Sequence, residues 1–179
     1  MRHTVIAGIL LLLATTVALA EQIFQTPRDF LAEVFAGTPP APKTLWLTGA
    51  VRSRAEAILG HRPRGLRVRY WQDAGAPERT AWILEEIGKE QPITVGLVVR
   101  DGRIEQVKVL VFRESRGWEV QRPAFTAQFR DAQLDDENRL DRNIDGITGA
   151  TLSVRALKKL ARLALFLDGQ VKRREQATP

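Results

Sequence analysis

The dipeptide Asp101-Gly102 lies between two long apolar runs, and it limits the possible folds more than any other feature of this chain. The runs cover residues 93–100 and 103–112, and each is long enough to form a strand. Asp-Gly favours the tight turn of a β-hairpin, because both residues tolerate the positive φ angles that such a turn needs. The sequence therefore predicts an antiparallel hairpin, and the rest of the fold must be built around a sheet.

Two further strands and three helices are expected around this hairpin. Alternating polar and apolar residues predict strands over residues 66–72 and 80–88. Helices are expected at residues 27–36, 50–59 and 153–167. The signals are apolar residues spaced by three and four, or a proline in the first turn with a glycine beyond the end of the helix. We therefore expect an α+β fold, a single domain in which helices flank an antiparallel sheet.

The segment between the hairpin and the last helix fits a sheet less well. Residues 118–129 are expected to be extended or irregular, because Pro123 cannot donate a hydrogen bond within a central strand. The aromatic side chains Trp118, Phe125 and Phe129 either pack in the core or form the wall of a ligand site. We expect at least two of the three to be core residues.

The first 20 residues have the features of a secretory leader. Arg2 precedes an apolar run over residues 4–20, which ends in the small-x-small pattern Ala18-Leu19-Ala20. We expect signal peptidase to cut after Ala20; the alternative is an uncleaved anchor, since the run is close to the shortest that spans a bilayer. The protein is thus expected to be periplasmic or otherwise extracytoplasmic, either free or anchored to the inner membrane by residues 4–20.

After this signal peptide (residues 1–20), the chain is expected to divide into three regions. Residues 21–65 form an N-terminal helical segment, and residues 66–168 form the main domain that contains the sheet. Residues 169–179 are a charged tail that we expect to fray. A chain of 179 residues has room for one such domain with a buried core.

The composition excludes several classes of function. The chain after the leader carries 26 basic and 21 acidic residues, but an exported protein rarely meets nucleic acid, so no nucleic-acid partner is expected. The absence of cysteine excludes disulfides, iron–sulfur clusters and covalently attached haem. His61 is the only histidine after the leader, and its neighbours indicate neither a metal site nor a hydrolase triad. No catalytic residue is assigned, and any redox chemistry must come from an organic cofactor.

Residues 145–153, Asp-Gly-Ile-Thr-Gly-Ala-Thr-Leu-Ser, place three hydroxyl groups around the predicted start of the last helix. A helix N-terminus attracts phosphate, because its free N–H groups and its dipole favour negative charge. Thr151 is the hydroxyl best placed to meet such a group, with Thr148 as a hydrogen-bond donor to the turn or the phosphate and Ser153 as the helix cap. On the residues alone, the segment could equally be a helix start with duplicate caps.

The same segment resembles the flavinylation motif of the FMN-binding domain family, which includes the C subunit of the sodium-pumping NADH:quinone reductase and the G subunit of the Rnf complex. The residues that match the motif are Asp145, Thr148, Gly149, Ala150 and Thr151. The resemblance extends over residues 80–167 and implies FMN bound covalently through a phosphoester to Thr151, with Leu152 and Ser153 beside it. It would make residues 66–168 an FMN-binding domain.

A second element of the family follows the second hairpin strand. Glu114, in the run Arg-Glu-Ser-Arg-Gly-Trp, resembles the family's Glu-Thr-x-Gly element, although Ser115 replaces the threonine. The resemblance places Glu114 beside the flavin; the alternative is a surface glutamate that closes a strand. Arg113 and Arg116 could stabilise a reduced, anionic flavin by their charge, but a solvated surface is the simpler interpretation.

Energetics favour a covalent link. A phosphate at a helix N-terminus gains about 0.3–2 kcal/mol, whereas micromolar retention of a ligand needs about 8 kcal/mol. Thr151 has no neighbouring base that could activate its hydroxyl. The resemblance implies a separate, magnesium-dependent flavin transferase that moves FMN from FAD, and Asp145 would present the loop to that enzyme or cap the turn.

The acidic loop before the motif also imitates a calcium site. The pattern Asp141-x-Asn143-x-Asp145-Gly146 matches the first half of an EF-hand loop. The twelfth position is Leu152, where the EF-hand requires a bidentate glutamate. We therefore expect no metal at this loop.

These observations predict an exported electron carrier with one FMN on Thr151, which relays electrons between an inner-membrane oxidoreductase and an extracytoplasmic acceptor and need not turn over a substrate of its own. Two alternatives stay open. One is a flavin-dependent reductase that acts directly on a small molecule, and the other is a non-redox binding or sensor module of a membrane assembly.

Overall fold

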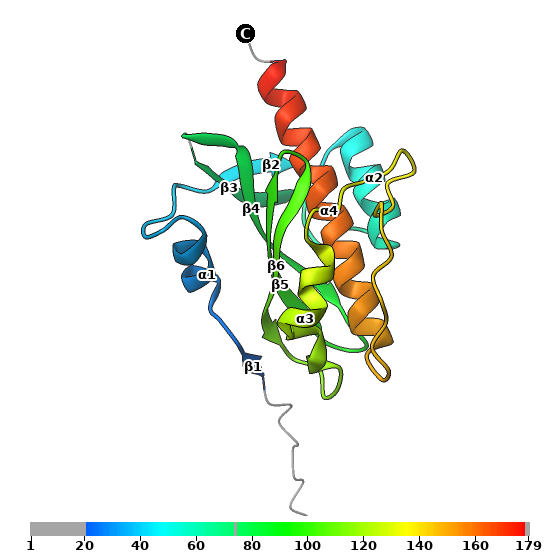
Figure 1. Cartoon of the computed structure of the whole chain (residues 1–179). Helices are drawn as coiled ribbons and strands as arrows, with labels where there is room; N and C mark the ends of the chain where they lie inside the picture. Colours follow the sequence, from blue (N-terminus) through cyan, green and yellow to red (C-terminus); the bar gives the residue numbers. More distant parts are fainter. Residues whose placement is uncertain (1–20, 74, 178–179) are drawn as a thin grey trace, which may run out of the picture.

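The computed structural model describes residues 21–73 and 75–177, so the predicted leader lies outside the described part of the chain. In this part, six antiparallel strands form one sheet in the order β1-β6-β5-β4-β3-β2 (Figure 1). The strands are β1 (Gln22–Ile23), β2 (Lys43–Trp46), β3 (Arg67–Asp73), β4 (Ala76–Ile87), β5 (Pro92–Arg100) and β6 (Arg103–Phe112). The helices are α1 (Pro27–Val34), α2 (Gly49–Leu59), α3 (Pro123–Thr126), α4 (Thr151–Gln176) and the short 3-10 turns η1 (Trp118–Gln121) and η2 (Ala127–Phe129).

Helices cover both faces of the sheet (Figure 1). The long helix α4 crosses one face with α2 beside it, and both helices contribute buried residues to the larger core. Helix α1 lies on the other face, in a smaller core made of Phe30, Leu31, Val34, Ala81, Val98, Leu110 and Val111. This arrangement confirms the predicted α+β fold, in which helices flank an antiparallel sheet.

The hairpin predicted from Asp101-Gly102 is formed by β5 and β6, with Arg100 opposite Arg103. Asp101 and Gly102 have φ angles of 51° and 74°, as a two-residue hairpin turn requires. Strand β5 is buried on both faces. On the α1 face, a Cβ atom at Gly96 would lie 2.6 Å from Cζ of Phe30, so α1 can approach the sheet this closely only because residue 96 is glycine.

A buried polar link fastens α4 to β4. The Trp82 indole N–H donates to the Thr80 hydroxyl oxygen (2.8 Å), and the Thr80 hydroxyl donates to Asp168 Oδ1 (2.7 Å). Asp168 is fully buried, and burial raises the pKa of its carboxyl group, while Lys172 Nζ lies 2.9 Å from Oδ2. The link and the buried side chain of Val171 stabilise α4 beyond Gly169. The prediction that the tail frays is therefore wrong for residues 169–176, which are helical.

Two other local predictions differ from the structure. Residues 118–129 are not extended; they form η1, α3 and η2, with Pro123 in the first turn of α3, where a missing N–H costs nothing. Strand β2 was not predicted, because four residues are too few to show a clear alternation. Phe125 and Phe129 are core residues as expected, whereas Trp118 is 38% exposed. No helix in the described ranges is long and apolar enough to cross a bilayer.

Candidate functional site

The predicted acceptor, Thr151, is the first residue of α4 and is exposed. Gly149, with φ of 82°, turns the chain just before the helix, and Ala150 is the buried N-cap residue. No side chain caps this end of the helix. The N–H groups of its first turn are therefore free to meet an anion, and the Thr151 hydroxyl lies among them.

Ser153 has a different position from the one predicted. It lies in the first turn of α4 and is 4% exposed, so the expectation that it caps the helix is wrong. The helix begins two residues earlier, at Thr151, and Ser153 faces inward against Gly117. A Cβ atom at Gly117 would lie 2.8 Å from the Ser153 hydroxyl oxygen, and Gly117 also has φ of 88°. This close contact fixes the start of α4 against the segment that follows β6.

Glu114 is buried and holds the turn between β4 and β5. Its Oε1 atom accepts hydrogen bonds from the backbone N–H groups of Lys89, Glu90 (2.7 Å) and Gln91 (2.9 Å). A Cβ atom at Gly88 would lie 2.8 Å from the same oxygen, so the carboxylate is packed directly against this turn. Glu114 thus has a structural task, and it is not the surface glutamate of the alternative interpretation.

Thr151 and Glu114 line one cavity of about 580 Å³, although they are far apart in the sequence. This volume is within the range of about 300–1,000 Å³ that small-molecule sites occupy. Its lining consists of Lys89, Glu114, Ser115, Arg116, Gly149, Ala150, Thr151, Leu152 and Ser153. The structure therefore brings together most of the residues singled out in the sequence, with two cations that suit a phosphate group.

Asp145 and Thr148 are exposed and do not line this cavity. The Asp145 backbone N–H donates to Gln128 Oε1 (2.8 Å), and the Asn143 side-chain amide donates to Asp145 Oδ1 (3.1 Å). Asp145 therefore shapes the loop before Thr151. No cluster of three or more metal-ligating side chains occurs among the residues that the structure describes.

A second cavity, of about 670 Å³, also includes Thr151 in its lining. Thr151 thus lies between two hollows, one beside Glu114 and one along α4. The second is strongly basic, and its cationic lining residues are Arg139, Arg142, Arg155, Lys158, Lys159 and Arg162. The spacing of the basic residues on α4 is visible in the sequence, but the contribution of Arg139 and Arg142 depends on how the preceding loop folds back.

Lys159 also belongs to a buried ion pair that sequence analysis did not predict. Glu86 on β4 is 5% exposed; Lys159 Nζ lies 3.0 Å from its Oε1 atom, and His61 Nε2 lies 2.9 Å from its Oε2 atom. The hydrogen bond between His61 Nδ1 and the Arg62 carbonyl oxygen (3.0 Å), and then the bond to Glu86, raise the pKa of His61. The three side chains connect the turn after α2 to the sheet and to α4.

Comparisons with known proteins agree with this geometry. Residues 88–165, which include Glu114 and Thr151, match the family model described as FMN-binding domain. The crystal structure of Shewanella oneidensis NqrC is similar in fold, with a TM-score of 0.57 and 16% sequence identity, over 79% of this chain and 87% of that chain. A search of curated proteins found no match. The family resemblance inferred from residues 145–153 is therefore confirmed.

The role of Glu114 can be tested by removing its carboxylate. Glu114→Ala should lower the free energy of unfolding by about 1.5–3 kcal/mol, because three backbone N–H groups lose a charged acceptor. Hydrogen exchange at the amides of residues 89–91 should accelerate. Glu119→Ala, which changes a nearby acid outside this turn, is the control. Unchanged exchange at residues 89–91 in Glu114→Ala would show that the carboxylate does not hold the turn.

The ion pair of Glu86 predicts a pH dependence. NMR titration of His61 should give a pKa above its ordinary value of 6.5. Because the pKa is higher in the folded state, the interaction stabilises the fold fully below about pH 6.5 and is lost as pH rises through the folded-state pKa. Glu86→Gln should lower the pKa of His61, whereas Glu56→Gln, which removes the ion-pair partner of Arg62 (Nε to Oε1, 3.7 Å) and leaves Glu86 in place, should not. Equal values in both variants would contradict the assignment.

Proposed function

We propose, from the FMN-binding domain that residues 88–165 match, that this protein carries FMN covalently on Thr151 and serves as an exported electron-transfer module. The observation that carries the proposal is the position of Thr151. Its side chain is exposed at an uncapped helix N-terminus and lines the same cavity as Glu114. A hydroxyl in this position can form a phosphoester whose charged oxygens meet the free N–H groups of α4.

The residues around Thr151 fit the phosphate end of FMN. Arg116 and Lys89 line the cavity and supply positive charge, while Gly149 and Ala150 leave room for the phosphate beside the backbone. These contacts position an anion but are too weak to retain it, because a helix terminus contributes about 0.3–2 kcal/mol against the roughly 8 kcal/mol needed for micromolar binding. A covalent bond removes this deficit for an exported protein that has little free flavin around it.

Maturation would require a separate enzyme. No histidine lines the cavity of Thr151, and His61 is bound to Glu86 on another part of the sheet. An aliphatic hydroxyl needs a base or a metal before it attacks a phosphoryl group. The exposed position of Thr151 suits a flavin transferase, which supplies the activation and transfers the FMN phosphoryl group from FAD.

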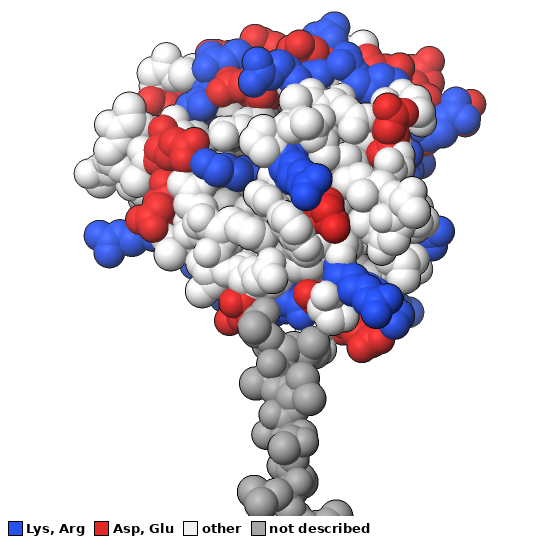
Figure 2. All heavy atoms as spheres, turned by 60° about the horizontal axis from the view of Figure 1, so that its bottom comes forward, with Lys and Arg blue, Asp and Glu red and all other residues white. Residues whose placement is uncertain are grey.

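Once bound, FMN supplies the redox chemistry, and the chain positions the cofactor and excludes water from one side of it. The start of α4 and strand β1, where the described chain begins, lie at the same end of the molecule (Figure 1). Figure 2 turns this end forward and shows uncharged residues over much of it, with a few charged side chains among them and more around the edge. A surface with few charged residues suits contact with a membrane-bound oxidoreductase as the electron donor or acceptor. Export and the membrane partner are proposed from the leader and from this arrangement.

The test is co-expression with a flavin transferase, followed by intact mass and visible absorbance. The protein should be yellow and heavier by one FMN minus one water. Thr151→Val should lose both signals and remain folded, because the residue is exposed. Thr148→Val and Ser153→Ala are matched controls that remove a neighbouring hydroxyl and should keep the flavin. Covalent flavin in Thr151→Val would disprove the assignment, and colourless protein from every variant would favour a non-redox module.

A further inference from the structure

The sheet contains an opening between β3 and β4. The two strands pair from Tyr70 opposite Trp82 toward Asp73 opposite Ala76. On the other side of Tyr70, residues 67–69 pair with β2, while residues 83–87 pair with β5, and these two segments do not pair with each other. Strands β3 and β4 therefore diverge from the Tyr70–Trp82 pair toward Arg67 on β3 and Ile87 on β4.

The turn that leads into β3 closes the far end of this opening. His61, at the start of that turn, binds Glu86 on β4. The opening is therefore bounded by one strand pair, one ion pair and the two diverging strands. A partner strand along β4 would have to displace the turn, whereas a small molecule would not.

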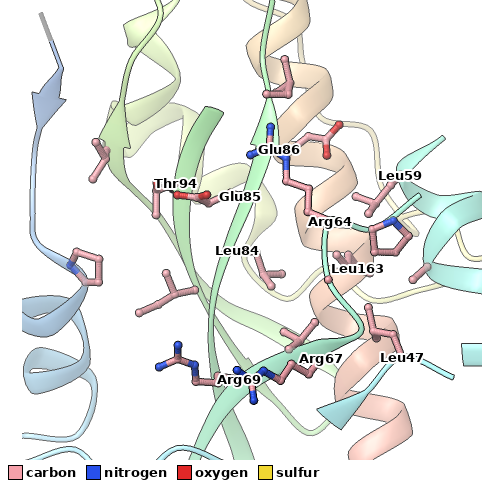
Figure 3. Close-up of a pocket in the computed structure, with 18 of the residues that line it drawn as sticks. Leu47, Leu59, Arg64, Arg67, Arg69, Leu84, Glu85, Glu86, Thr94 and Leu163 are labelled. Atoms are coloured by element: carbon pink, nitrogen blue, oxygen red, sulfur yellow. Dashed lines mark hydrogen bonds between the residues drawn. The ribbon is translucent and has the colours of Figure 1, made fainter. Parts of the chain in front are cut away.

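A cavity of about 690 Å³ occupies the opening (Figure 3). Its volume is in the range of about 300–1,000 Å³ that is usual for small-molecule sites. The walls come from both faces of the sheet. Leu47, Leu59, Leu84 and Leu163 belong to the core on the α4 side, and Leu31, Trp71, Ile83 and Val111 belong to the core on the α1 side. A ligand in this cavity would meet mainly aliphatic and aromatic side chains.

The charges at the rim are unbalanced. Both acids are already engaged: Glu86 binds His61 and Lys159, and Glu85 accepts a hydrogen bond from Thr94 (2.6 Å). Four arginines of the lining, by contrast, have no side-chain hydrogen bond or ion pair within residues 21–73 and 75–177. They are Arg28, Arg64, Arg67 and Arg69, and Figure 3 shows Arg67 and Arg69 on the β3 side of the opening and Arg64 reaching toward Glu86 on β4.

We propose that this opening is a binding site for an amphipathic anion, a fatty-acyl chain with a carboxylate head. The acyl chain lies against the apolar walls, and Arg67 and Arg69 bind the carboxylate at the rim, because guanidinium groups form paired hydrogen bonds with carboxylates. The site is separate from Thr151, which lines other cavities. Ligand binding here therefore does not depend on the flavin.

The test is NMR titration of the purified protein with dodecanoate below its micelle concentration. Saturable shifts should occur at residues 67–69 and 83–86, and in Thr151→Val as in the unmodified protein. The double variant Arg67→Gln/Arg69→Gln should raise the Kd about tenfold or more, since it removes two charged donors to the carboxylate. Methyl dodecanoate, which lacks the charge, should bind weakly to both proteins.

The matched control is Arg52→Gln/Arg54→Gln, which removes two arginines of α2 that do not line the cavity and should leave the Kd unchanged. Ile83→Trp should fill the opening and abolish binding, with circular dichroism to verify the fold. The proposal is overturned by equal binding of the ester, or by an unchanged Kd in Arg67→Gln/Arg69→Gln. It is also overturned if an acidic peptide binds along residues 83–87 instead, or if binding is seen only with anionic vesicles and not with dodecanoate.

Discussion

The packing of α4 across the sheet determines where the hydroxyl of Thr151, the proposed acceptor, lies. The helix is one rigid element of 26 residues, and its position is fixed at two distant points. Near its C-terminal end, Asp168 accepts a hydrogen bond from Thr80 inside the core. At its N-terminal end, Ser153 packs against Gly117, where no larger residue fits without movement. Because both contacts are buried, Thr151 is held at a constant place on the surface while its own side chain stays accessible.

The site combines the start of α4 with the turn between β4 and β5, at the end of β5 away from the Asp101-Gly102 turn. Glu114 organises the β4–β5 turn through three backbone N–H groups, and that turn brings Lys89 to the cavity of Thr151. One carboxylate therefore serves the fold and the proposed FMN site together. The opening between β3 and β4 is built differently, from unpaired strand edges, apolar walls and arginines at the rim. We therefore propose a ligand with an acyl chain and a carboxylate for it.

The features that the sequence predicted are those that local chemistry determines. The positive φ angles of Asp101 and Gly102 follow from the dipeptide itself, and the spacing of apolar residues in α4 follows from helical geometry. The position of Thr151 at the helix start was predicted from the motif. The prediction that Ser153 caps the helix was wrong. The N-cap residue is the buried Ala150, and sequence patterns locate the ends of helices poorly.

Other features depend on residues that meet only in the folded chain. His61, Glu86 and Lys159 lie on three different elements, and no pattern in the sequence connects them. The divergence of β3 from β4 is also invisible in the sequence, since the residues on both strands alternate as in a paired sheet. The cavity lined by Arg67 and Arg69 could therefore be found only from the structure.

The central claim is that FMN is esterified to one particular hydroxyl, and locating the bond tests it most directly. Trypsin should release residues 143–155 of the flavinylated protein as one peptide, which contains Thr148, Thr151 and Ser153. Tandem mass spectrometry of that peptide assigns the added mass to a single residue. The structure predicts FMN on Thr151, the exposed first residue of α4. FMN on Thr148 or Ser153, or a flavin-free peptide from yellow protein, would contradict the account.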